Sequence, residues 1–122
     1  MSEAETRRRL MLRRQALVVL RAVQGAGYDG WLSERALYRT LRAEADDLAQ
    51  AEVRECLAYL ADRGYAQRRA GGPVAMLPGA SKPSARITSA GVDLLDGTVA
   101  ADPGVAPLGA IDFGPGTLDF GL

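Results

Sequence analysis

Histidine is absent from this 122-residue sequence, and cysteine occurs only once, at Cys56. Without histidine the chain has no imidazole to act as a general base or to complete a His-based catalytic triad. A single cysteine forms no intramolecular disulfide, and without histidine it cannot complete a structural zinc site. We therefore expect no metal, no other cofactor and no enzymatic activity.

Long apolar runs and a net charge are also missing. No run approaches the length of a membrane-spanning helix, and the N-terminus mixes acids with arginines where a signal peptide would be apolar. The formal net charge is zero, with 15 basic and 15 acidic side chains. Because duplex binding relies on neutralising phosphates, this balance does not by itself favour a nucleic-acid partner. We expect a soluble intracellular protein that does not bind membranes.

The charges and the Gly/Pro content are unevenly distributed along the chain. Five arginines lie within residues 7–14, whereas no basic residue follows Arg86 and five aspartates lie between residues 93 and 119. After Gly97 the sequence is rich in glycine and proline, which is typical of an extended tail. We predict a domain over residues 1–98 and an irregular tail over residues 99–122.

Residues 5–24 contain no Gly or Pro, and their apolar residues recur at helical spacing, which predicts the first helix. Apolar residues at helical spacing form one stripe that we expect to face the core, namely Leu12, Ala16, Val19, Leu20 and Val23. Arginine and leucine alternate along the other side, at Arg7, Leu10, Arg14, Leu17 and Arg21. This second set is either a solvated face or a partner contact. Since the leucines gain nothing in water, we favour contact with a second copy or an assembly partner.

Two more helices are predicted in the middle of the chain. Ser33 is well placed to cap the second helix of the chain, and Asp47 with Gln50 resembles a capping box at the start of the third. This third helix ends at Gly64. Its buried stripe is expected to be Val53, Cys56, Leu57 and Leu60, which makes Cys56 a core residue rather than a nucleophile.

The rest of the domain reads as a hairpin and a short helix. Residues 65–69 and 85–88 are predicted strands on either side of a Gly/Pro-rich loop. Thr88 or Ser89 can cap a fourth helix that ends at Gly97. The order helix, helix, helix, strand, loop, strand, helix predicts an α+β, mainly α, winged helix-turn-helix domain in which the hairpin is the wing.

Several short stretches also carry a likeness to a known family, namely VR at 53–54, LAYL at 57–60, GY at 64–65 and ITSAGVDLL at 87–95. They resemble small winged-helix proteins, often called ArsR-like, of Mu-like transposable phages and prophages. In that family a T-x-x-G helix and a Val-Pro-Gly-Val-like stretch follow the wing, similar to DPGV at 102–105 here. The resemblance covers about residues 10–107 and implies a winged-helix phage protein in the bacterial cytoplasm. It implies no metal site, since the ligands of metal-sensing ArsR relatives are missing.

The winged-helix prediction suggests double-stranded DNA as a partner, by analogy with the fold. The candidate contact residues lie on the second helix, the start of the third helix and the wing, and are Arg35, Arg39, Arg42, Gln50, Arg54, Arg68, Arg69, Lys82 and Arg86. Arg54 is the best candidate to touch a base. Glu52, Glu55 and Asp62 argue against groove reading, because carboxylates repel phosphates.

The alternative function is a protein-interaction adaptor. It would use the first helix together with Phe113 and Phe120, which lie beside aspartates in the tail and are suited to fill pockets on a neighbour. A disordered terminus with two incidental aromatic residues is the simpler interpretation of this segment. The sequence leaves both functions open: a DNA-binding regulator or accessory of a DNA transaction, and an adaptor in an assembly.

Overall fold

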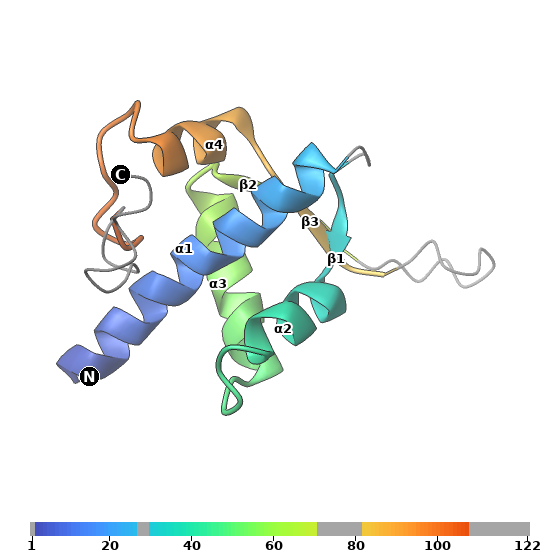
Figure 1. The fold of residues 1–122 in the computed structure, drawn as a ribbon, viewed down its shortest axis with the longest axis vertical. Helices are drawn as coiled ribbons and strands as arrows, with labels where there is room; N and C mark the ends of the chain where they lie inside the picture. Colours follow the sequence, from blue (N-terminus) through green and yellow to red (C-terminus); the bar gives the residue numbers. More distant parts are fainter. Residues whose placement is uncertain (1, 27–29, 71–81, 108–122) are drawn as a thin grey trace, which may run out of the picture.

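The computed structural model describes residues 2–26, 30–70 and 82–107. Over these residues the chain forms four α-helices and one three-stranded antiparallel sheet (Figure 1). The elements are α1 (Glu3–Gly25), β1 (Leu32–Ser33), α2 (Glu34–Arg42), α3 (Gln50–Asp62), β2 (Ala66–Arg69), β3 (Ser84–Ile87) and α4 (Ser89–Asp96), with strand order β1-β3-β2. The predicted α+β, mainly helical class is confirmed, and the element order is compatible with a winged helix.

Side-chain caps define where two of the predicted helices begin. Ser33 caps α2, because its hydroxyl accepts a hydrogen bond from the backbone N–H of Ala36 at 3.1 Å. Thr88 caps α4 in the same way, accepting from the N–H of Gly91 at 3.1 Å. Both predicted caps are confirmed.

The predicted cap of the third helix is wrong. Ala49 occupies the N-cap position of α3, and the carboxylate of Glu52 accepts from its backbone N–H at 3.0 Å. Asp47 instead accepts from Arg8 Nη1 of α1 at 2.8 Å. The physical reason is Leu48: it is buried in the core, and the turn that places it there delays the start of the helix.

The core lies between α1, the helix pair α2–α3 and the inner face of the sheet. The predicted α3 stripe of Val53, Cys56, Leu57 and Leu60 is buried throughout. The predicted α1 stripe is confirmed only in part, at Leu12, Ala16 and Leu20, whereas Val19 and Val23 are half-buried.

The arginine–leucine side of α1 is not an open face. Leu17 has no exposed surface, and Arg14 is buried as well, so the prediction that both lie on a contact face is wrong. Figure 1 shows why: α4 and the segment after it lie along one side of α1, while α2 lies on the other. With elements on both sides, α1 buries more than one stripe.

The segment that follows α4 belongs to the same core. Val105 and Ala106 are buried, and the backbone N–H of Ala106 donates to the carbonyl of Leu10 on α1 at 3.0 Å. The domain therefore extends past the predicted boundary at residue 98. Residues 108–122, the rest of the predicted tail, lie outside the described residues.

Candidate nucleic-acid interface

Three exposed arginines follow one side of α2 at spacings of four and three residues: Arg35, Arg39 and Arg42. Together with Tyr38, Ala43 and Gln50 they line a hollow of about 370 Å³ between α2 and the first turn of α3. Arg42 donates to the hydroxyl of Tyr38 at 3.1 Å. Within the part of the chain that the structure describes, none of these arginines pairs with a carboxylate, so their charge is available to an anion.

A buried carboxylate, Glu34, connects this surface to α3 and to the sheet. Its side chain is only 7% exposed, and Oε2 accepts from Arg68 Nη2 of β2 at 3.0 Å. Oε1 lies 3.9 Å from Nε of Arg54 on α3. The two arginines thus share one negative charge at the first turn of α2, next to the exposed Arg35. Nothing in the sequence marked Glu34, since an acidic residue after a capping serine is ordinary at a helix start.

Strand alternation separates the arginines of the hairpin. Arg68 is paired with Ala85 on the face that carries the buried residues Ala66 and Ile87. Arg69 and Arg86 lie on the opposite, outer face, where their guanidinium carbons are 4.1 Å and 4.8 Å from the centroid of the Trp31 ring. The predicted wing arginines therefore do not form one group.

Eight of the nine predicted contact residues thus fall into two surfaces. Six of them lie around the α2–α3 hollow and the Glu34 junction, namely Arg35, Arg39, Arg42, Gln50, Arg54 and Arg68. Arg69 and Arg86 share the outer face of the sheet with Trp31, a residue that sequence reasoning did not select. Lys82 is exposed, and its carbonyl accepts from the hydroxyl of Ser84.

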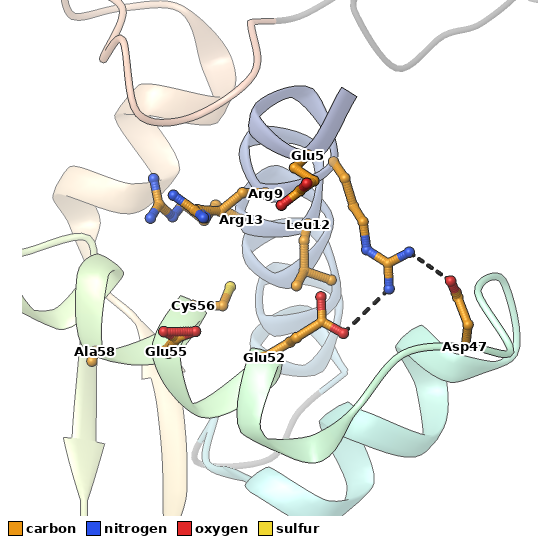
Figure 2. Close-up of a pocket in the computed structure, with 10 residues that line it drawn as sticks. Glu5, Arg9, Leu12, Arg13, Asp47, Glu52, Glu55, Cys56 and Ala58 are labelled. Carbon is orange, nitrogen blue, oxygen red and sulfur yellow. Dashed lines mark hydrogen bonds and ion pairs between the residues drawn. The ribbon is translucent and has the colours of Figure 1, made fainter. Parts of the chain in front are cut away.

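The acidic residues of α3 line a different surface. Glu52 and Glu55 border a cleft of about 630 Å³ between α1 and α3, with Arg8 and Arg9 on its α1 wall (Figure 2). Glu52 accepts from Arg8 Nη2 at 3.2 Å, and Asp47 shares the same guanidinium. Glu52 is therefore half-buried and paired with a cation of α1, whereas Glu55 is exposed at the border of the cleft.

Arg13 closes the other end of this cleft. Its guanidinium carbon lies 3.7 Å from the centroid of the Tyr59 ring, and Nη1 donates to the carbonyl of Gly104 at 2.9 Å. Burial lowers the pKa of Arg13. Cys56 also borders the cleft but is only 2% exposed, and burial raises the pKa of its thiol to about 12. The predicted core role of Cys56 is confirmed.

The predicted partner-binding residues of α1 are dispersed. Arg7 is exposed and Leu10 is half-buried, whereas Arg14 and Leu17 are buried. Arg21 forms an ion pair with Asp96 of α4. These residues therefore do not form a continuous contact face. Phe113 and Phe120 lie outside the described residues.

Two general features bear on the kind of partner. No helix within residues 2–26, 30–70 and 82–107 combines the length and apolar character that crossing a membrane requires. Over the same ranges no group of three or more acidic or cysteine side chains is arranged to hold a metal ion.

Comparison of this chain with models of protein families, with curated proteins and with solved structures returns no match. The resemblance to ArsR-like phage proteins therefore stays a prediction.

Proposed function

We propose that this chain is a non-enzymatic winged helix-turn-helix protein that binds double-stranded DNA, mainly through its phosphates. It acts as a transcription regulator or as an accessory to a DNA transaction of a phage or prophage. The observation that carries the proposal is the hollow between α2 and α3, bordered by Arg35, Arg39 and Arg42. Planar guanidinium groups match phosphate oxygens in geometry and charge, and in this motif α2 crosses the DNA backbone.

The start of α3 supplies the polar groups that suit base edges. Gln50 borders the same hollow, and Arg54 follows one turn later with 58% of its side chain exposed. Gln and Arg are the side chains that most readily form paired hydrogen bonds to adenine and guanine in the major groove. We assign phosphate contacts to the arginines of α2 and base contacts to Gln50 and Arg54.

The distribution of charge supports this assignment despite the zero net charge. Around the hollow and the Glu34 junction there are five arginines and one buried glutamate, whereas Asp47, Glu52 and Glu55 border the cleft on the α1 side of α3. An approaching phosphate backbone meets the basic surface, and the effect of the distant charges is reduced by salt screening.

The adaptor alternative loses support on α1. Its predicted contact face includes Arg14 and Leu17, and both are buried. Self-association through the exposed remainder of α1, such as Arg7, is not required by the proposed DNA contact and stays a prediction.

The test removes two proposed phosphate contacts and compares the loss of duplex affinity with that of a charge-matched control variant. We expect Arg35→Ala/Arg39→Ala to weaken duplex binding and to reduce the slope of log K against log salt by about 1.8, or roughly 0.9 for each lost phosphate contact. Fluorescence anisotropy with a labelled duplex, repeated over a range of salt concentrations, measures both quantities.

The control is Arg7→Ala/Arg9→Ala, which removes the same charge from α1 and should leave the slope nearly unchanged. Equal losses in the two variants would mean that only the overall charge matters. No binding of the unaltered protein at low salt would refute the proposed function.

A further inference from the structure

The outer face of the sheet holds two arginines against one aromatic ring. Arg69, at the end of β2, and Arg86, in the middle of β3, lie over Trp31, with their guanidinium carbons 4.1 Å and 4.8 Å from the ring centroid. Arg86 is fixed further, because its Nε donates to the side-chain carbonyl of Gln67, its cross-strand partner, at 2.7 Å. The positions of both cations are thus set by ordered strands rather than by a loop.

Two positive charges held beside the same ring repel each other. Arg68, on the other face, is paired with Glu34, but neither Arg69 nor Arg86 pairs with a carboxylate among the residues that the structure describes. The negative face of the indole ring offsets only part of this repulsion. An anion bound between or beside the two guanidinium groups would offset the rest through charge-assisted hydrogen bonds.

We propose that Trp31, Arg69 and Arg86 form a phosphate-binding site on the outer face of the sheet, and that its ligand is a phosphodiester of a nucleic acid backbone. The site is separate from the proposed DNA surface, because strand alternation places it on the face opposite Arg68. Two arginine forks suit the tetrahedral, multiply accepting phosphate better than a single carboxylate.

The phosphate can come from two sources with the same chemistry. It belongs either to the duplex already held at α2 and α3, which then contacts the protein at two places, or to a second nucleic-acid segment. In the second case the protein bridges two segments.

Trp31 makes the site observable by itself, since it is the only tryptophan in the chain. We expect inorganic pyrophosphate, and a short single-stranded oligonucleotide of thymidines, to change its fluorescence in a saturable manner. Arg69→Ala and Arg86→Ala should each weaken pyrophosphate binding by about tenfold, as expected for the loss of a charged hydrogen-bond donor.

The control for this titration is Arg35→Ala/Arg39→Ala, which alters the proposed DNA surface and should leave the pyrophosphate affinity unchanged. That comparison separates the two proposals, because the fluorescence response persists even if the α2–α3 surface binds no DNA. The absence of a saturable response in the unaltered protein, or an equal response in the Arg69→Ala/Arg86→Ala variant, would overturn the proposed site.

The source of the phosphate is then identified by capture of a labelled duplex on an immobilised one. If Arg69→Ala/Arg86→Ala abolishes capture but preserves affinity for a single duplex, a second segment occupies the site. If the same variant lowers single-duplex affinity and the salt slope, one duplex reaches both surfaces. A variant that changes neither capture nor affinity contradicts a nucleic-acid ligand.

Discussion

At the scale of single residues, Asp102 holds the segment after α4 against the domain. Its buried carboxylate accepts from the hydroxyls of Tyr59 and Tyr65 at 2.8 Å and 2.7 Å, and from the N–H of Gly104 at 2.7 Å. Burial acts to raise the pKa of Asp102, but these hydrogen bonds outweigh it and the pKa is lowered. This carboxylate therefore connects α3, the residue that precedes β2 and the segment that follows α4.

The contribution of Tyr65 to the hydrogen bonds around Asp102 depends on pH. Its hydrogen bond to Asp102, together with burial, raises the pKa of Tyr65 from its ordinary value of 10.0 to about 12. The pKa of Tyr65 is higher in the folded than in the unfolded state. The stability that its hydrogen bond to Asp102 contributes is therefore complete below about pH 10 and is lost as the pH rises toward 12. We expect Tyr65→Phe to lower the free energy of unfolding by about 1–2 kcal/mol at pH 8, and by progressively less above pH 10.

Urea unfolding followed by circular dichroism at pH 8, 10 and 11 measures this difference. The matched control is Tyr38→Phe, whose hydroxyl bonds the exposed Arg42 and should change stability little. A loss for Tyr65→Phe that does not vary with pH would show that the hydroxyl ionises no differently in the folded state.

At the scale of elements, the T-x-x-G motif explains how α4 is attached to the sheet. The hydroxyl of Thr88 donates to the carbonyl of Gly64 at 2.6 Å and accepts from the N–H of Gly91. A Cβ atom at Gly91 would lie 2.3 Å from the carbonyl oxygen of Tyr65 and 2.7 Å from a side-chain carbon of Ile87. Glycine is therefore required here because α4 approaches Tyr65 and Ile87 closely. Its backbone conformation does not require glycine, since any residue can adopt it.

Gly91→Ala tests this close approach. We expect it to lower the free energy of unfolding by about 1–3 kcal/mol, because a methyl group at this position must displace the backbone of Tyr65 or move α4. Gly25→Ala is the matched control: it lies at the end of α1 with nothing within 4 Å of the added Cβ and should be neutral or slightly stabilising. Denaturant unfolding compares the two variants, and equal effects would contradict the packing argument.

Helix starts show what local sequence predicts about elements. Ser33 and Thr88 were identified because a hydroxyl at the N-cap position satisfies a backbone donor a few residues ahead, which is a local interaction. Asp47 was assigned the same role and instead pairs with Arg8, 39 residues away in sequence. A competing partner so distant along the chain gives no local signal.

At the scale of the whole molecule, residues 102–106 complete the core that α1 to α4 leave open. Asp102, Val105 and Ala106 are all buried, and the carbonyl of Leu10 accepts from Ala106. We expect a chain that ends at residue 98 to have a lower free energy of unfolding than a chain that ends at residue 107. The expected difference is about 2 kcal/mol or more, which is the contribution of burying the Val105 side chain.

Thermal and urea unfolding of the two shortened chains measure this difference. Asp102→Ala in the longer chain is the control, since it removes the hydrogen bonds while keeping the apolar residues. Equal stability of the chains ending at residues 98 and 107 would show that this segment only lies on the surface.

Local patterns in the sequence are enough to predict the four helices, the two hairpin strands and the buried stripe of α3, but not β1 or the N-cap of α3. Helical spacing on α3, the caps at Ser33 and Thr88, and the hairpin strands each depend on neighbours within a few residues. The basic side chains were also recognisable as candidates.

The division of those basic side chains between surfaces depends on tertiary contacts. Strand alternation places Arg68 against Glu34 and turns Arg69 toward Trp31, and the packing of α1 beside α3 gives Glu52 its partner Arg8. Packing of α4 and residues 102–106 also buries Leu17, which its spacing alone placed on an outer face. These outcomes depend on contacts between residues far apart in the chain, so charge and periodicity indicated which residues matter but not which of them meet.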